Sequence, residues 1–390
     1  MRIAVVFVGW GCVAHIARKM AMELADKGHQ VDLFTRGQLA EESPITHRSM
    51  HYLSPPSWME WMCGEKGVEP GDFLFRSWHL LRRKYDVVHV APGHRPSVLI
   101  PCLLAKYLRG SIIVDEWWEW FGRDGVCAYR GGGFKKLMSW YDSLVELPAK
   151  RWFDIVLPIT RTLANRIPNH PCCYVLHGAI DKSLKTGQTV AEARQALGRD
   201  ENLFIIGMSN VEEWDHVDNH LFFEAVADVC ASHSNLHLLL TGEEPFIHNT
   251  ILKIIPEDRV TVLGWMTFEE YRQNLAACNM FALPYPDNPR NRGRWPNKLG
   301  DYIALQRPVL TNPTGDVGEM VGKWDLGFLC PHKKDEYIRQ VEDLCIDQAL
   351  VAPENFGFTK IPVEELMDFE ERVDRMLEIY EKRAKARECH

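Results

Sequence analysis

The sequence lacks the features that mark several common classes of protein. Its eleven cysteines include no Cys-x-x-Cys pair and follow no regular spacing, which disfavours a disulfide framework or a structural zinc site and suits a reducing compartment. A formal net charge of −8 argues against nucleic acid as a partner. No run of about 20 apolar residues occurs, so no bilayer-spanning segment is expected. These absences favour a globular protein of the cytoplasm.

Strand and helix patterns alternate along the whole chain of 390 residues. A first series of apolar, strand-like runs is followed by a polar stretch at 182–189, after which the alternation restarts. A charged amphipathic helix pattern at 363–385 ends the chain and has no strand after it. This order predicts an α/β protein made of two Rossmann-like, doubly wound domains, at 1–178 and 179–371.

A glycine-rich turn follows the first predicted strand. Gly9-Trp-Gly-Cys-Val-Ala14 matches the G-x-G-x-x-A pattern of dinucleotide-binding turns. The second strand ends at Phe34-Thr35-Arg36 without the acidic residue that NAD requires, although Arg36 would suit the 2′-phosphate of NADP. An NADP-dependent oxidoreductase is therefore one alternative. A turn that contacts another ligand, or a tight turn that needs only small residues, explains the motif equally well.

The most informative stretch is Arg294-Trp-Pro-Asn-Lys-Leu-Gly-Asp-Tyr-Ile-Ala-Leu-Gln-Arg-Pro-Val-Leu-Thr311. It predicts a loop that enters a short helix, followed by another strand. Amide groups at the start of a helix can hold phosphate oxygens, and Lys298 adds a positive charge there. Asp301 lies about one turn further on, where a carboxylate would accept hydrogen bonds from sugar hydroxyls.

This stretch resembles the nucleotide-sugar site of retaining GT-B glycosyltransferases of the group 1, or family 4, class. Their pattern there is Pro-x-Lys-Leu-x-Glu-Tyr-x-Ala-x-Gly-x-Pro-Val. Weaker matches occur in the family's order at 27–35, 177–181, 239–243 and 259–264. The resemblance implies a GT-B fold, with a C-terminal helix at about 372–390 that crosses back to the first domain. It also implies retaining transfer of a sugar from a nucleotide-sugar donor to a saccharide or lipid-linked acceptor, with no cofactor and no divalent metal expected.

The resemblance also implies the residues of the donor site. Lys298 and Asp301 would carry the catalytic roles on the donor side, and Trp265 would stack on the base. The expected donor-binding residues are Gly11, Ser209, Asn210, Gly242, Trp265, Arg292, Arg294, Asn297, Lys298 and Asp301.

Two departures from the family pattern affect this site. Gly293 stands where the family has the first glutamate of an E-x7-E pair, and Asp301 replaces the second. The strand–helix unit at 208–218 lacks the family's Arg and Lys and carries Glu212, Glu213, Asp215 and Asp218, which would repel a diphosphate. Arg290, Arg292, Arg294 and Lys298 are candidates to compensate. A solvated arginine-rich loop, or a non-catalytic relative that acts as a binding or scaffold protein, is the alternative.

Acceptor contacts are expected after the fourth strand of the first domain. Asp115 and Glu116 could bind hydroxyl groups, Trp117 could stack on a sugar ring, and Glu116 is the candidate catalytic carboxylate there. His94 is assigned to the acceptor side as well. A loop that only covers the end of the sheet would have the same composition.

A predicted helix at 134–145 carries an apolar stripe next to several cations. Its stripe consists of Phe134, Leu137, Met138, Tyr141, Leu144 and Val145, and Arg130, Lys135 and Lys136 lie near its start. This pattern fits a core helix, and it also fits a helix at a membrane interface. Peripheral contact with the inner face of a membrane therefore stays open.

Overall fold

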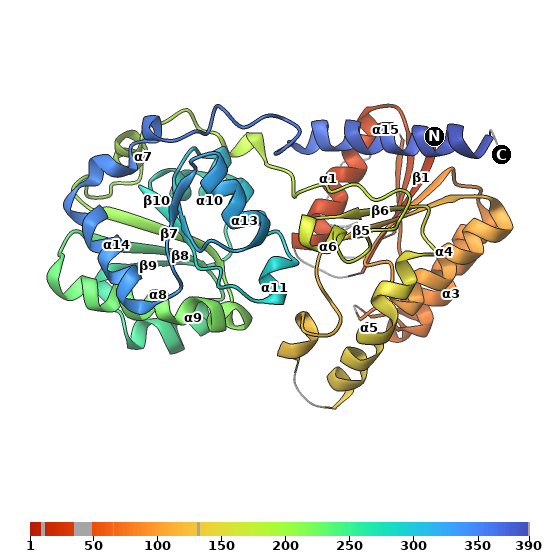
Figure 1. The fold of residues 1–390 in the computed structure, drawn as a ribbon, viewed down its shortest axis with the longest axis horizontal. Coiled ribbons are helices and arrows are strands. Elements are labelled where there is room, and N and C mark those ends of the chain that lie inside the picture. The colour runs from red at the N-terminus through yellow and green to blue at the C-terminus, as the bar shows by residue number, and fades with distance from the viewer. Residues whose placement is uncertain (9–11, 35–48, 65, 131–132, 389–390) are drawn as a thin grey trace. The chain divides into compact units, whose positions relative to one another are not determined.

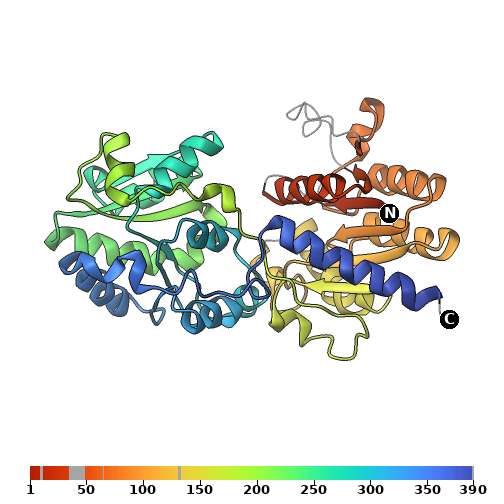
Figure 2. The same ribbon diagram turned by 90° about the horizontal axis from the view of Figure 1, so that it is seen from above.

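The computed structural model describes residues 1–8, 12–34, 49–64, 66–130 and 133–388. The chain forms two compact units (Figures 1 and 2). Unit 1 comprises Met1–His177 and Met367–His390, and unit 2 comprises Gly178–Leu366. No helix in the described ranges is both long and apolar enough to cross a bilayer.

Unit 1 is built on a parallel six-stranded sheet with the order β3-β2-β1-β4-β5-β6. Its central strands are rich in Val and Ile and buried on both faces, as expected where helices cover both sides of a parallel sheet. The strands are β1 Arg2–Phe7, β2 Gln30–Phe34, β3 Met50–Leu53, β4 Val87–Ala91, β5 Ile112–Trp117 and β6 Ile155–Pro158. The helices are α1 Cys12–Asp26, η1 Ser57–Met62, α3 Pro70–Arg82, α4 Pro96–Arg109, η2 Val126–Tyr129, α5 Phe134–Lys150, α6 Arg161–Ala164 and α15 Phe369–Glu388.

The C-terminal helix α15 packs in unit 1, although the residues before it in sequence belong to unit 2 (blue in Figure 1). Val373, Met376 and Ile379 enter the same apolar core as Ala17 and Ala21 of α1. Helix α15 begins at Phe369, six residues later than predicted, because residues 363–366 form turns and a bend. The predicted return of the last helix to the first domain is thus confirmed.

Unit 2 repeats this architecture with the strand order β12-β11-β10-β7-β8-β9, again all parallel. The strands are β7 Phe204–Val211, β8 Leu236–Gly242, β9 Val260–Leu263, β10 Met280–Leu283, β11 Val309–Thr311 and β12 Gly327–Leu329. The α-helices are α7 Val190–Ala196, α8 His216–Ser232, α9 Glu244–Thr250, α10 Phe268–Ala276, α11 Pro289–Arg292, α12 Asn297–Ala304, α13 Gly315–Lys323 and α14 Lys334–Ile346. Short 3-10 turns are η3 Lys182–Leu184, η4 Glu213–Asp215, η5 Ile251–Lys253, η6 Glu257–Arg259, η7 Gln348–Val351 and η8 Pro353–Asn355.

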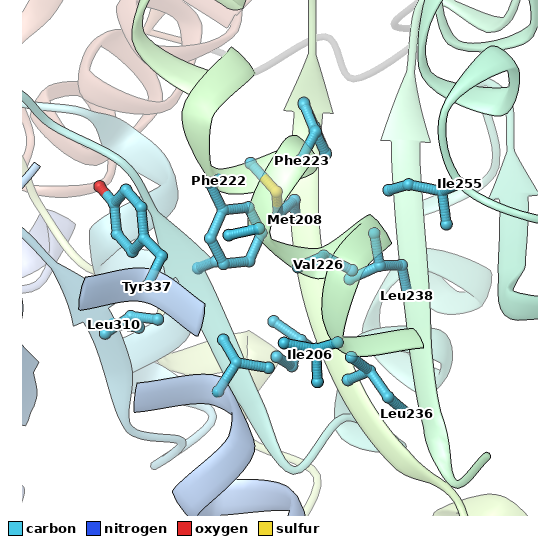
Figure 3. Packing of buried hydrophobic residues seen from close by; sticks show 14 of the residues in the cluster. Ile206, Met208, Phe222, Phe223, Val226, Leu236, Leu238, Ile255, Leu310 and Tyr337 are labelled. Carbon is cyan, nitrogen blue, oxygen red and sulfur yellow. The ribbon is translucent and has the colours of Figure 1, made fainter. Parts of the chain in front are cut away.

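Helix α8 covers the centre of this second sheet. Figure 3 shows Phe222 and Val226 of α8 among Ile206 and Leu238 of the strands, with Tyr337 of α14 beside them. All five side chains are fully buried. This packing fixes the N-terminal end of α8 next to the carboxyl end of β7, where the acidic residues of the 208–218 segment lie.

Two segments differ from what the apolar pattern predicts. The apolar run at 173–176 forms only an isolated bridge, between Val156 and Cys173, although Tyr174 and Leu176 donate to carbonyl groups of β6. Strand β3 was not predicted, since Met50–Leu53 is short and only partly buried at the edge of the sheet.

Candidate functional site

In unit 2, the start of α12 meets the carboxyl end of β7. Pro296 stands at the N-cap, and no side chain caps the helix. The ammonium group of Lys298 donates to the backbone carbonyls of Ser209 (3.2 Å) and Asn210 (3.4 Å), and its side chain is 15% exposed. Lys298 therefore joins the two segments in which the sequence predicted donor-binding residues.

Two of the four acidic residues in the 208–218 segment, Asp215 and Asp218, are paired with cations from the later loop. Asp215 accepts a hydrogen bond from Arg294 (3.1 Å) and lies 3.7 Å from the ammonium group of Lys298. Asp218 accepts from Arg294 (3.1 Å) and from the buried Arg290. Three cations thus face two carboxylates, and one positive charge is left over in this group of five side chains. The repulsion that Asp215 and Asp218 would exert on a diphosphate is thus offset within the unit, whereas Glu212 and Glu213 take no part in these ion pairs.

The pKa values of these acids follow from the cluster. Burial by itself raises the pKa of Asp215, but the charges of Lys298 and Arg294 outweigh burial and hold the pKa below its usual value. Burial raises the pKa of the neighbouring Glu212, and the charges of Asp215 and Glu243 raise it further. Asp215 is therefore ionised at neutral pH, and it fixes the orientation of the two cations.

Trp214 lies against the arginines of the cluster. The guanidinium groups of Arg290 and Arg294 lie 5.1 Å and 4.9 Å from the centre of its ring, and the ring is 47% exposed. Its indole N–H donates to Glu212. The guanidinium group of Arg294 also lies 5.2 Å from the centre of the Tyr285 ring. Contact with both rings restricts the orientation of this guanidinium group.

Arg292 does not belong to this cluster. Its guanidinium forms a two-pronged pair with Asp287, with both N–O distances at 2.5 Å, and its side chain is 50% exposed. Of the four cations expected to compensate, the structure brings together Arg290, Arg294 and Lys298 and leaves Arg292 at the surface.

Asp301 lies one turn into α12. The phenol of Tyr271 donates to its carboxylate at 2.8 Å, and Asp301 itself is only partly buried. The next residue, Tyr302, is fully buried and stacks on Phe281, and its hydroxyl accepts from the backbone N–H of Ser209 at 3.0 Å. These contacts fix α12 against β7 and hold the Asp301 carboxylate at the partly exposed side of the helix.

The ends of β7 and β8 have an unusual backbone. Asn210 has φ +49°, and the register between the two strands shifts between Met208 and Val211. Gly242 has φ +137°, and a Cβ there would come within 2.4 Å of the carbonyl oxygen of Val211. Only glycine permits this close approach.

Two further residues predicted for the donor site lie on other elements of unit 2. Trp265, after β9, is 83% exposed, and Asn297 is the first residue of α12.

Gly11, the remaining residue predicted for the donor site, lies outside the described residues, as do Thr35 and Arg36. Asp32, the acidic residue of β2, lies within the described residues. Its carboxylate is buried and accepts from Tyr85 (2.6 Å) and Arg83 (2.9 Å). This carboxylate is therefore committed to contacts inside unit 1.

The three acceptor residues predicted at 115–117 are inside unit 1. Asp115 is 0% exposed, accepts from the N–H of Gly93 (2.8 Å), and forms an ion pair with Lys150 (2.5 Å). Trp117 is also 0% exposed and donates to Glu146 at 2.9 Å. Direct stacking of Trp117 on a sugar, or hydrogen bonding of Asp115 to one, is not supported, because these groups already have buried partners.

Glu116 is committed to the C-terminal helix. One carboxylate oxygen accepts from His89 (2.7 Å), and the other accepts from Arg372 of α15 (2.5 Å). Burial alone would raise the pKa of Glu116, but Arg372 and His89 outweigh burial and lower the pKa to about 2. These contacts anchor α15 to β5 through Glu116, and its catalytic role on the acceptor side stays a prediction.

His94 is buried next to a network that the sequence did not reveal. Its Nε2 donates to Asp142 at 3.0 Å, and Asp142 also pairs with Arg95 and Arg130. Burial lowers the pKa of His94, which favours the neutral ring. Its Nδ1 has no hydrogen-bond partner among the described residues.

The signal that could have revealed this network is a spacing of four. Asp142, Glu146 and Lys150 repeat at i, i+4 and i+8 and therefore share one face of α5. The sequence interpretation attended only to the apolar residues of this helix.

No group of three or more potential metal ligands occurs among the described side chains. The rings of His216 and His220 lie 6.1 Å apart on α8 without a third ligand.

Comparison with known families identifies both halves of the chain. The profile of the family described as "Glycosyl transferases group 1" matches residues 201–347, and that of "Glycosyl transferase 4-like domain" matches residues 11–176. Together the two matches cover most of the sequence. No curated protein sequence gives a significant match.

Solved structures with the same fold cover nearly the whole chain. Sucrose-phosphate synthase from Thermosynechococcus elongatus has a TM-score of 0.73 at 15% identity, covering 99% of this chain and 100% of its own. HepE from Anabaena, solved with UDP and glucose, has 0.69 at 16% identity, covering 98% and 100%. UDP-GlcNAc 2-epimerase from Neisseria meningitidis has 0.61 at 12% identity, covering 98% and 100%. These likenesses confirm the predicted GT-B fold, which transferases and an epimerase share.

Proposed function

This chain belongs to the group 1 glycosyltransferases with the GT-B fold, and on that premise we propose that it transfers a sugar from a nucleoside diphosphate sugar to a saccharide or lipid-linked acceptor, with retention. Unit 2 would bind the donor, and unit 1 would present the acceptor. UDP is the first nucleotide to consider, since HepE was solved with UDP.

The observation that carries this proposal is the meeting of Lys298 and Arg294 at the start of α12. Amide groups at an uncapped helix start attract anions, and two oriented cations stand beside them. This set would bind the diphosphate and stabilise the charge that develops on it as the glycosidic bond breaks. Asn297 contributes to the same helix start.

The roles of the other donor residues follow from their positions. The partly exposed carboxylate of Asp301 would accept hydrogen bonds from the donor's hydroxyl groups, with Tyr271 fixing its orientation. Trp265, which is 83% exposed, would offer its face to the base. The tight turns at Asn210 and Gly242 would let the backbone approach the donor closely. Ser209 directly precedes the first of these turns.

The acceptor side would use His94 and the network behind it. The acceptor hydroxyl would attack the anomeric carbon while the bond to the diphosphate breaks, and its proton would pass to a diphosphate oxygen. No protein base is then required, which agrees with the buried, paired state of Asp115 and Glu116. The Nδ1 of His94 lacks a described hydrogen-bond partner but is buried, so an acceptor would reach it only if the surrounding side chains moved, while Asp142 holds the ring.

A second candidate is a non-catalytic relative that binds a nucleotide or a partner protein. Gly293, in place of the family's glutamate, favours it, and so does the internal pairing of the cations by Asp215 and Asp218. This candidate predicts nucleotide binding without turnover, or no nucleotide binding at all.

The proposal is tested with a thermal-shift panel of UDP, GDP, ADP, CMP and NADP⁺ on the wild type and on Asp301→Ala. A ligand present at about 100 times its Kd adds roughly 2.7 kcal/mol to the free energy of unfolding. We expect one nucleoside diphosphate to stabilise the wild type, and Asp301→Ala to lose most of that gain. Hydrolysis or transfer of the matching nucleotide sugar then separates the enzyme from the non-catalytic relative. If no nucleoside diphosphate stabilises the wild type at millimolar concentration, the proposal of a donor site in unit 2 is wrong.

A further inference from the structure

Helix α5 has the reverse of the usual polarity for a helix on a sheet. Its buried face carries the charged residues Asp142, Glu146 and Lys150, which are at most 1% exposed. Its opposite face carries large apolar residues at spacings of three and four, with the following exposed fractions: Phe134 49%, Leu137 57%, Trp140 62% and Leu144 53%. We call these four residues the α5 apolar face.

The buried contacts prevent this helix from turning its apolar face inward. Asp142 pairs with Arg95 (2.9 Å), and Glu146 accepts from the indole of Trp117 and from the N–H of Phe121 (2.8 Å). Lys150 is paired with Asp115. Rotating the helix would leave several buried charges without partners, at a cost well above the gain from hiding four apolar side chains. The α5 apolar face is therefore held outward by the polar network beneath it.

The exposed charges of α5 and of the residues that directly follow it all have one sign. Among residues 133–152, the exposed charged side chains are Lys135, Lys136 and Arg151, and every carboxylate in this segment is at least partly buried. The whole chain carries a net charge of −8, so the positive charge of this surface is opposite in sign to the net charge of the chain. The ammonium group of Lys66 also lies 5.0 Å from the centre of the Phe134 ring. Apolar side chains flanked by cations are complementary to a surface of anionic lipid headgroups over acyl chains.

We propose that α5 docks this protein peripherally on an anionic membrane, with its apolar face in the headgroup–acyl boundary and Lys135, Lys136 and Arg151 on the lipid phosphates. A second copy of the chain is a poorer occupant, because two such faces would bring like charges together. The inference concerns binding alone and does not depend on the proposed transferase activity.

Co-sedimentation of the full chain with vesicles tests this proposal. One set of vesicles is phosphatidylcholine, and the other is phosphatidylcholine mixed with phosphatidylglycerol. We expect binding to the mixed vesicles, little binding to pure phosphatidylcholine, and weaker binding at high salt. The variants Leu137→Ser and Trp140→Ser should each weaken binding several-fold. Lys135→Glu should weaken it by about fivefold or more, on the scale of one cation at a lipid surface.

The matched control is Ile346→Ser, which removes an apolar side chain that is 73% exposed on α14 of unit 2. It should leave vesicle binding unchanged. All four positions are exposed, so circular dichroism and melting temperature should match the wild type and confirm folding.

Two outcomes would overturn the proposal. One is a wild type that stays in the supernatant with both kinds of vesicle. The other is an oligomer in light scattering that Trp140→Ser converts to a monomer without any effect on vesicle binding, which would assign the α5 apolar face to contact between copies.

Discussion

The two units place similar polar side chains in opposite settings. In unit 2, Lys298, Arg294 and Asp215 pair at 10–15% exposure, next to the exposed ring of Trp214 and to the buried Arg290–Asp218 pair. In unit 1, Asp115 pairs with Lys150 and Glu116 pairs with Arg372, at 0–7% exposure. The first arrangement can still exchange a protein partner for a ligand, whereas the second can do so only by breaking buried ion pairs. Exposure, more than residue type, separates a binding cluster from a structural one.

The largest effect on stability is expected for Asp115→Asn, which tests whether burial distinguishes the two units. This change leaves Lys150 buried without its counter-charge, and we expect a loss of about 3–5 kcal/mol in the free energy of unfolding. Urea unfolding measures it. As the matched change in unit 2, Asp287→Asn removes the exposed partner of Arg292 and should cost less than about 1 kcal/mol. Equal effects of the two substitutions would mean that burial does not distinguish the units.

A second test uses pH. The pKa of Glu116 is lowered from 4.5 to about 2 in the folded state, so its contribution is fully present above its unfolded pKa. Stability should fall as the pH drops from about 4.5 towards 2, because the unfolded chain takes up the proton first. Urea unfolding of the wild type and of Glu116→Gln across this range should show a smaller pH dependence in the variant. The same slope in both would assign the acid sensitivity to other groups.

A third test sharpens the account of unit 2. Asp215→Asn removes one of the two carboxylates that face three cations and leaves the excess positive charge larger. We expect the affinity for the active nucleoside diphosphate to rise by about threefold to tenfold in titration calorimetry, with some loss of stability. A lower affinity would show that Asp215 is needed chiefly to orient Lys298 and Arg294.

The smallest effect is expected at the surface. Trp265→Ala should leave the unfolding free energy almost unchanged, because the side chain is 83% exposed. If the ring stacks on the base, nucleotide affinity should fall by several-fold, and Trp78→Ala, at a 62% exposed tryptophan of unit 1, should leave it unchanged. Unchanged affinity in Trp265→Ala would remove this residue from the donor site.

These comparisons show how far the sequence could be interpreted. Apolar runs and their alternation were sufficient for most strands of both sheets, because burial of Val- and Ile-rich strands dominates the fold, whereas the return of α15 to unit 1 followed from the family resemblance. The motif around Lys298 and Asp301 was sufficient for the loop, helix α12 and strand β11, because these elements are continuous in sequence, whereas the contact of α12 with β7, about 85 residues earlier, required the structure. Roles for Asp115 and Trp117 could not be judged, since their partners Lys150 and Glu146 lie about 30 residues away.

Helix α5 shows the same limit from the other side. Its predicted stripe combined Leu144 with Met138, which the structure places on opposite sides of the helix, exposed and buried. Hydrophobicity alone could not separate them, because the buried face is held by charges whose partners lie on other elements.

The measurement that tests the central claim most directly is titration calorimetry of the active nucleoside diphosphate with Lys298→Ala. Removing a charge-assisted hydrogen bond of about 1.5–3 kcal/mol should raise the Kd by roughly tenfold to a hundredfold. The matched control is Lys334→Ala at the start of α14, whose ammonium group pairs with the exposed Asp228 at 2.9 Å, and it should bind like the wild type. Equal affinity in the wild type and Lys298→Ala would contradict a diphosphate site at the start of α12.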